Sequence, residues 1–175
     1  MSLHTNVVRI KAVAESLKEL KDKVVFVGGA TVALYAQNKN ITDLRPTDDV
    51  DVIIELASYC GYSSLDETLR KIGFANDVNS GVICRYTIQG IIVDVMPTEP
   101  NVIGFSNPWY PEGYKNAIAY NLDKNLAIKI FSLPYFIASK IEAFKSRGAN
   151  DYRASTDFED IVYVLDRGAD LIEGK

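Results

Sequence analysis

Two short stretches of the sequence carry aspartates at positions where their carboxylates could share a metal ion. In TDDVDVII, residues 47–54, the acids come directly before an apolar run. Side chains alternate along a β-strand, so Asp49 and Asp51 share one face and Asp48 falls at the entry of the strand. A further acid, Asp94, stands inside the apolar run IIVDVMP at residues 91–97 and has no local basic partner. These acids need a counter-charge from elsewhere, because a buried unpaired charge is costly.

The spacing predicts that this counter-charge is a divalent metal. If strand 91–96 lies beside strand 50–56, the carboxylates of Asp49, Asp51 and Asp94 meet on one face of the sheet. Two metal ions about 3.5–4 Å apart would neutralise such a cluster, as they do in polymerases and other enzymes of phosphoryl transfer. One ion would activate an attacking hydroxyl, and the other would hold a triphosphate and stabilise the leaving pyrophosphate. Without metal, we expect the carboxylates to repel one another.

Gly28 and Gly29 form a candidate phosphate site. They follow the apolar run VVFV at residues 24–27 and precede ATVALYAQ at 30–37, which has a helical pattern. Glycines let a phosphate approach the backbone, and a helix N-terminus offers free N–H groups. No Gly-Lys-Ser or Gly-Lys-Thr follows, so the segment is not a P-loop. A glycine pair alone is typical of a tight strand-to-helix turn, but the Asp-x-Asp strand after it makes the phosphate interpretation more specific.

Hydrophobic periodicity predicts a mixed α/β fold that would position these residues. We expect helices at 6–21, 30–37, 63–74, 134–147 and 156–167, and strands at 24–27, 50–56, 82–88, 91–96, 117–120 and 126–131. Ser64 and Thr156 begin capping boxes, Gln89 and Gly90 form a hairpin turn, and residues 97–116 form a long loop. This order predicts a small mixed β-sheet with helices on one face, plus C-terminal helices. We expect one domain at 1–175, with a catalytic core at 1–116 and C-terminal strands and helices at 117–175.

The composition limits the chemistry further. The chain is 47% hydrophobic and 24% charged, which is ordinary for a soluble globular protein. It has neither a signal peptide nor an apolar run of about 20 residues, so we expect a cytoplasmic protein without membrane partners. The only histidine, His4, leaves no basis for a zinc site or a Ser-His pair, so a metal here should be Mg²⁺ or Mn²⁺. The net charge of −4 argues against a general nucleic-acid coat protein.

The combination of the glycine pair with TDDVD and a later strand aspartate resembles the DNA polymerase beta-like nucleotidyltransferase superfamily. The pattern FVGGATVALY…RPTDDVDVII is most similar to the branch of AbiEii-type toxins and other small bacterial and archaeal nucleotidyltransferases. The resemblance implies that Asp49 and Asp51 are paired metal ligands, that Asp94 is the third catalytic carboxylate, and that Gly28 and Gly29 face phosphate. The second turn residue is often Ser in this superfamily, and Gly29 lacks that hydroxyl.

The C-terminal segment resembles the same branch more loosely. SKIEAFKSRG offers Lys140 and Arg147 at the spacing of its Lys-x₆-Arg element, and DFEDIVYVL resembles its Asp-x-x-Asp helix through Asp157 and Asp160. Lys140 and Arg147 share a helix face and are candidate phosphate ligands, although a solvated face fits them equally well. Asp157 fits the first turn of a helix, where negative charge is favoured for structural reasons.

Two classes of function follow from these patterns. The first is an Mg²⁺-dependent nucleotidyltransferase that moves NMP from an NTP to a hydroxyl of RNA, protein or a small molecule, with a toxin-like role and an antitoxin or other partner protein as further expectations. The second is a non-catalytic module of the same fold that binds a nucleotide or a partner. The presence of all three carboxylates favours the enzyme. In the loop, Trp109, Tyr110 and Tyr114 could stack on a base or simply pack on the sheet.

Overall fold

Seven strands form one mixed sheet in the computed structural model, which describes residues 5–36, 44–56, 58–147 and 151–167. The strands are β1 (Val24–Val27), β2 (Asp49–Ile54), β3 (Ala75–Asn76), β4 (Arg85–Ile88), β5 (Ile91–Pro97), β6 (Ile118–Asn121) and β7 (Ala127–Ile130). Their order in the sheet is β3-β4-β5-β2-β1-β7-β6. The predicted mixed α/β fold is therefore confirmed, and its C-terminal strands join the same sheet as the N-terminal ones. His4 lies outside the described residues.

The register of the central strands brings the two acidic stretches together. β2 pairs with β5 in parallel, and Asp51 stands directly opposite Asp94. β1 runs antiparallel to β2 and parallel to β7. The prediction that strand 91–96 lies beside strand 50–56 is thus confirmed. Since side chains alternate, Val50 and Val52 point to the opposite face, where they are fully buried.

The helices are α1 (Thr5–Leu17), α2 (Val32–Tyr35), α3 (Tyr59–Lys71), α4 (Pro100–Ile103), α5 (Tyr110–Lys115), α6 (Leu133–Arg147) and α7 (Thr156–Arg167). The first predicted helix ends early, and a 3₁₀ segment at Lys18–Lys23 leads into β1. The loop at 97–116 contains two helices that were not predicted, α4 and α5. Pro100 and Pro111 are compatible with them because both stand in the first turn of a helix, where proline is tolerated. No helix in the described part of the chain combines the length and apolar character needed to cross a bilayer.

Two further predicted boundaries were wrong, those of α3 and β4; the bounds of α7 were correct, but its capping residue was not the predicted one. α3 begins after Ser58, whose hydroxyl accepts from Gly61 N, while Ser64 lies inside the helix and donates to the Cys60 carbonyl. Ser155 caps α7 one residue before Thr156, and its hydroxyl accepts from Phe158 N. The strand expected from residue 82 begins at residue 85, because the preceding residues form turns around Gly81, which has a φ of 70°.

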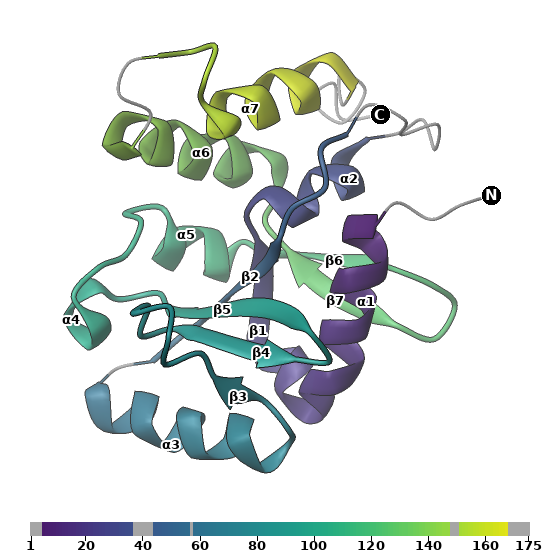
Figure 1. The fold of residues 1–175 in the computed structure, drawn as a ribbon. Coiled ribbons are helices and arrows are strands. Elements are labelled where there is room, and N and C mark those ends of the chain that lie inside the picture. The colour runs from purple at the N-terminus through teal and green to yellow at the C-terminus, as the bar shows by residue number, and fades with distance from the viewer. Residues whose placement is uncertain (1–4, 37–43, 57, 148–150, 168–175) are drawn as a thin grey trace.

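The helices lie in two groups on either side of the sheet (Figure 1). α3 lies below β4 and β5, and its Asp66 accepts a hydrogen bond from the hydroxyl of Tyr86, a residue on the face away from the aspartates. α5 and the α6–α7 pair lie above the sheet, on the side of the acidic cluster. The face of the sheet that carries the aspartates is therefore roofed by the C-terminal helices rather than open to solvent.

Candidate active site

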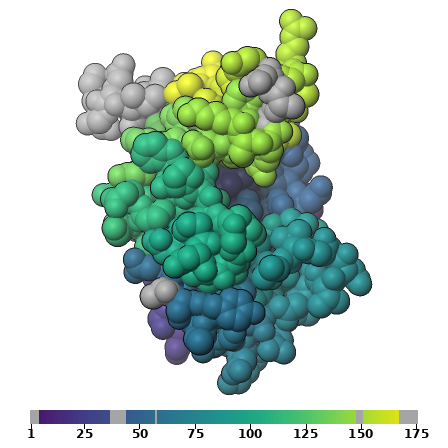
Figure 2. Space-filling view, turned by 90° about the vertical axis from the view of Figure 1, so that its left-hand side faces the viewer, coloured from purple at the N-terminus to yellow at the C-terminus, as the bar shows by residue number. Residues whose placement is uncertain are grey.

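A cleft of about 620 Å³ lies between the sheet and the α6–α7 pair. Figure 2 shows the hollow below the yellow-green α6–α7 end of the molecule. Its floor is formed by the ends of β1, β2 and β5, and its roof by α6 and α7. The predicted residues that line it are Gly28, Gly29, Asp49, Asp51, Asp94, Lys140 and Arg147. The structure thus gathers every residue singled out for catalysis or nucleotide binding around one cavity.

The three predicted carboxylates meet on the floor of this cleft. Each of Asp49, Asp51 and Asp94 offers one carboxylate oxygen, and these atoms all lie within 4.8 Å of one another. Asp49 and Asp51 share a face because they are two apart on β2, and the parallel pairing of β2 with β5 adds Asp94 to the same face. Oxygen ligands at this spacing suit a hard divalent cation.

The pKa of Asp51 is raised by its position in this cluster. Burial, followed by the neighbouring charges of Asp49 and Asp94, raises its pKa from 3.8 to about 7. Lys140 and Arg147 oppose the shift from across the cleft. The positive charge of the roof therefore offsets only part of the cost of ionising Asp51 in the metal-free protein.

The expectation that Asp94 has no basic partner was wrong. Arg85 donates to both oxygens of its carboxylate, from Nε to Oδ1 at 2.8 Å and from Nη2 to Oδ2 at 2.7 Å. The same Nη2 lies 3.6 Å from Oδ2 of Asp49. The signal for this pair was present in the sequence: a hairpin with Gln89 and Gly90 at its turn places Arg85 opposite Asp94. Part of the predicted counter-charge is therefore supplied by the protein.

Gly28 makes room for Asp51 rather than for a phosphate alone. It has a φ of 73° and a ψ of −167°, a backbone conformation that residues other than glycine rarely adopt. A Cβ atom built on Gly28 would stand 2.0 Å from Oδ2 of Asp51. At Gly29 a Cβ would be 3.0 Å from Cγ2 of Thr47 and 3.4 Å from Oδ2 of Asp160, so the serine common at this position in the superfamily would be crowded here.

The helix expected directly after the glycines is short. Gly29–Thr31 form a 3₁₀ turn, and α2 covers only Val32–Tyr35 among the described residues. The dipole of so short a helix adds little, so any phosphate contact at this turn would depend on individual backbone N–H groups.

We expect Gly28→Ala to destabilise the protein by more than the roughly 1–3 kcal/mol of a strained backbone, because the new methyl group also collides with the Asp51 carboxylate. Urea denaturation would measure the loss. In an Asp51→Ala background the same substitution should cost clearly less, since most of the colliding atoms are gone. Equal costs in the two backgrounds would show that the glycine does not serve the carboxylate.

Lys140 and Arg147 belong to an ion-pair network that joins α6 to α7. Nζ of Lys140 lies 3.0 Å from Oδ1 of Asp157 and 2.6 Å from Oδ2 of Asp160. Arg147 donates from Nε and Nη2 to the two oxygens of Asp157, at 2.8 and 2.9 Å. Burial alone would lower the pKa of Lys140, but the carboxylates of Asp160 and Asp157 raise it. The solvated-face interpretation is therefore wrong for Lys140, whose side chain is 8% exposed, whereas that of Arg147 is 69% exposed.

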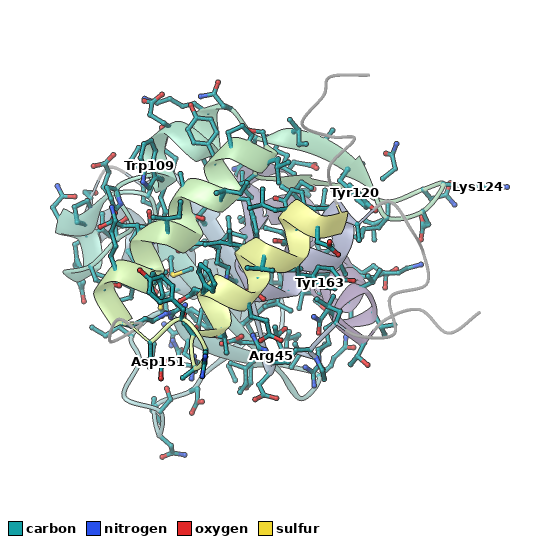
Figure 3. All side chains as sticks on the ribbon, turned by 90° about the horizontal axis from the view of Figure 1, so that it is seen from above. Arg45, Trp109, Tyr120, Lys124, Asp151 and Tyr163 are labelled. Atoms are coloured by element: carbon teal, nitrogen blue, oxygen red, sulfur yellow. The ribbon has the colours of Figure 1, made fainter. Side chains whose placement is uncertain are left out.

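Arg45 is a cationic residue of the cleft that the sequence analysis missed. Its side chain is 40% exposed, and its ion pairs are long, 3.6 Å to Glu159 and 4.0 Å to Asp160. Figure 3 shows it beside α7. It stands two residues before Thr47 in RPTDDVD, so its position next to the acidic strand was the available signal.

The aromatic residues of the loop behave differently from one another. Tyr110 is packed against Phe131, and Tyr114 donates its hydroxyl proton to the Lys23 carbonyl. Trp109 lies on the far side of α6 from α7 (Figure 3). Phe105, which the sequence analysis did not single out, lines the cleft with 47% of its surface exposed. Of the aromatic residues in this loop, Phe105 and Tyr110 line the cleft, and Phe105 is the more exposed of the two.

The fold of the chain is that of nucleotidyltransferase-like proteins. An antigenic nucleotidyltransferase-like protein from Paracoccidioides brasiliensis matches 94% of this chain and 78% of its own, with 18% identity and a TM-score of 0.60. The antibiotic-resistance factor ANT(2'')-Ia matches 99% of this chain and 90% of its own in solution, with 15% identity and a TM-score of 0.58. In complex with adenylyl-2''-tobramycin it matches 98% and 94%, with 16% identity and a TM-score of 0.55.

No protein-family model matches the chain, and no curated protein sequence matches it. At the identities of the structural matches, the similarity establishes the fold alone. The finer resemblance to the AbiEii-type branch stays a prediction.

Proposed function

We propose that this protein is a divalent-metal-dependent nucleotidyltransferase that moves NMP from an NTP to the hydroxyl of an acceptor. The observation that carries the proposal is the convergence of Asp49, Asp51 and Asp94 within 4.8 Å at the floor of a cleft with a basic roof. The fold supports it, because the chain is similar in fold to a nucleotidyltransferase-like protein and to ANT(2'')-Ia, which has been solved with an adenylylated compound.

The donor set of the cluster fits Mg²⁺ or Mn²⁺. All three ligands are carboxylates, which hard cations prefer, and the pKa of Asp51 is raised by burial and by the charges of Asp49 and Asp94, which a cation would offset. A divalent metal bound there would stabilise the negative charge that develops on the transferring phosphoryl group. We assign Asp49, Asp51 and Asp94 as its ligands.

Residues on one side of the cleft would activate the acceptor, and residues on the other side would bind the triphosphate. On the floor, the carboxylate cluster would orient the acceptor hydroxyl and take up its proton as the hydroxyl oxygen bonds to the α-phosphorus. The bond from that phosphorus to pyrophosphate breaks in the same exchange. On the other side, the backbone N–H groups at Gly28 and Gly29 and the cations Arg45, Lys140 and Arg147 would hold the triphosphate.

We expect Arg45→Gln to weaken NTP binding about tenfold, which corresponds to the loss of one charge-assisted hydrogen bond. The remaining affinity should depend less on salt than that of the wild type. Isothermal titration calorimetry at two salt concentrations would test this. Arg70→Gln, a matched substitution on α3, is the control and should leave binding unchanged. Equal affinities for Arg45→Gln and the wild type would remove Arg45 from the phosphate site.

A small molecule with a hydroxyl group is the acceptor class that we favour over RNA and protein. The support is that one structure of ANT(2'')-Ia contains an adenylylated small molecule in the same fold. The requirement for NTP would place this activity in the cytoplasm. We do not include a toxin role or an antitoxin partner in the proposal, because no feature of the cleft or of the comparisons supports either one.

Incubation with each labelled NTP, Mg²⁺ and pools of hydroxyl compounds, RNA and cell protein would test the proposal directly. We expect label to pass from an α-phosphate to an acceptor with release of pyrophosphate, and chromatography of the products would identify the acceptor class. NTP binding without transfer to any pool would instead favour the non-catalytic module of the same fold.

A further inference from the structure

Arg85 occupies both oxygens of one of the three clustered carboxylates. Its Nε and Nη2 donate to Oδ1 and Oδ2 of Asp94, and Nη2 also approaches Asp49. This bidentate geometry is among the strongest of charged hydrogen bonds. A cation that used Asp94 as a ligand would compete with the guanidinium for the negative charge of these two oxygens.

The other cations of the cleft pair with carboxylates of α7 rather than with the cluster. Lys140 and Arg147 influence Asp51 electrostatically, but their hydrogen bonds go to Asp157 on α7. Arg45 pairs at long range with Glu159 and Asp160. Among the described residues, Arg85 is therefore the cation in direct contact with the carboxylate cluster.

Arg85 also has a second carboxylate on its other side. The β3–β4 register, in which Asn76 stands opposite Tyr86, continues by one residue to Asp77, whose backbone N–H donates to the Arg85 carbonyl at 3.0 Å. Asp94, Arg85 and Asp77 thus form a row across neighbouring strands, with the arginine in the middle. Side chains directly opposite one another in antiparallel strands share a face.

The two sides of Arg85 open into two different cavities. It lines the main cleft with Asp94, and it lines an adjacent hollow of about 430 Å³ with Asp77. The carboxylate of Asp77 makes no ion pair with the other residues that the structure describes. The guanidinium thus has both a partner and space on the side away from the cluster.

We propose that Arg85 is an exchangeable counter-cation of the cluster, which holds Asp94 in the metal-free protein and moves to Asp77 when a divalent metal takes Asp94. This inference rests on the proposed metal-dependent function. Arg85 acts as a positioning residue: it keeps the Asp94 carboxylate oriented toward the cleft without metal, and it sets the affinity for metal by competing for the same oxygens.

The affinity for Mn²⁺ alone, measured from the electron paramagnetic resonance signal of free Mn²⁺, tests the exchange without any turnover. We expect Arg85→Gln to bind Mn²⁺ about tenfold more tightly than the wild type, within the usual range of coupling between sites. Arg85→Lys keeps the charge but cannot form the bidentate pair, so it should also bind more tightly. The control Arg70→Gln removes a surface charge from α3 and should change nothing.

Replacing Asp77 is expected to change the affinity for Mn²⁺ in the opposite direction. Asp77→Asn removes the second partner, so Arg85 stays on Asp94 and Mn²⁺ affinity should fall several-fold. In an Arg85→Gln background the same change should have no effect, whereas a general electrostatic effect of Asp77 would persist there.

The outcomes separate the inference from the proposed function. Unchanged Mn²⁺ affinity in Arg85→Gln and Arg85→Lys would overturn the exchange and leave the metal site standing. If neither the wild type nor these variants bound Mn²⁺, both the exchange and the metal-dependent function would fail. Circular dichroism of each variant would establish that it is folded, and Arg85→Lys keeps the test available if Arg85→Gln does not fold.

Discussion

Replacing Asp51 by Asn is expected to abolish nucleotide transfer and, in the absence of metal, to make the protein more stable at neutral pH. Transfer should fall by at least about a thousandfold, since several kcal/mol of charge stabilisation would be lost together with a metal ligand. Stability should rise because burial and the charges of Asp49 and Asp94 raise the pKa of Asp51 to about 7, so its ionised form is disfavoured.

The raised pKa of Asp51 also predicts in which direction the stability of the metal-free protein changes with pH. The pKa of Asp51 is about 7 in the folded protein and 3.8 as a free group, so between these values the folded state binds the extra proton. The unfolding free energy of the metal-free wild type should therefore fall as pH rises from about 4 to about 7, by at most about 1.4 kcal/mol per pH unit from this group. Asp51→Asn should lack this component.

Urea denaturation of both proteins across that pH range, with a chelator present, would measure the difference. Asp48→Asn is a matched control, because Asp48 lies at the mouth of the same cleft but outside the cluster. If Asp51→Asn instead lost several kcal/mol without metal, Asp51 would have a stabilising role in the protein itself. The carboxylates would then be structural, and the proposed function would lose its basis.

Replacing Lys140 by Met is expected to destabilise the protein by about 3–5 kcal/mol, the usual result of removing one partner of a buried ion pair. Arg147 would still neutralise Asp157, but Asp160 would keep only the long contact to Arg45. Asp160 is 4% exposed and cannot regain water without separating α7 from the rest of the cleft. A loss of NTP binding in this variant would thus report the loss of the network as well as the loss of a phosphate ligand.

A second substitution tests whether the unpaired charge of Asp160 causes this loss of stability. Asp160→Asn added to Lys140→Met should recover part of the lost unfolding free energy, because it removes the charge that was left buried. Lys145→Met on the same helix is the control: its side chain is 66% exposed and lies 3.8 Å from Glu142, so we expect a change within about 0.5 kcal/mol. Equal stabilities of the Lys140 and Lys145 variants would contradict the structural role.

The parts of the site that could be predicted are those governed by local rules. Alternation along a strand places Asp49 and Asp51 on one face, and the apolar neighbours of Asp94 place it in a second strand of the core. The glycine pair marks the end of β1 because Gly28 adopts a φ of 73° that other residues avoid. The Arg85–Asp94 pair could have been predicted by the same means, since the hairpin turn determines which residues stand opposite one another.

Contacts between distant segments could not be predicted in this way. That Lys140 is buried depends on α7 packing against α6, and a helical pattern cannot reveal which face another helix will cover. The same packing brings Arg45 beside Glu159 and places Gly29 against Asp160, more than 100 positions along the sequence. The spacing of the residues thus determined the acidic cluster and the chemistry it favours. Only the tertiary structure decided that Arg45, Lys140 and Arg147 surround it, because those side chains are brought together by folding.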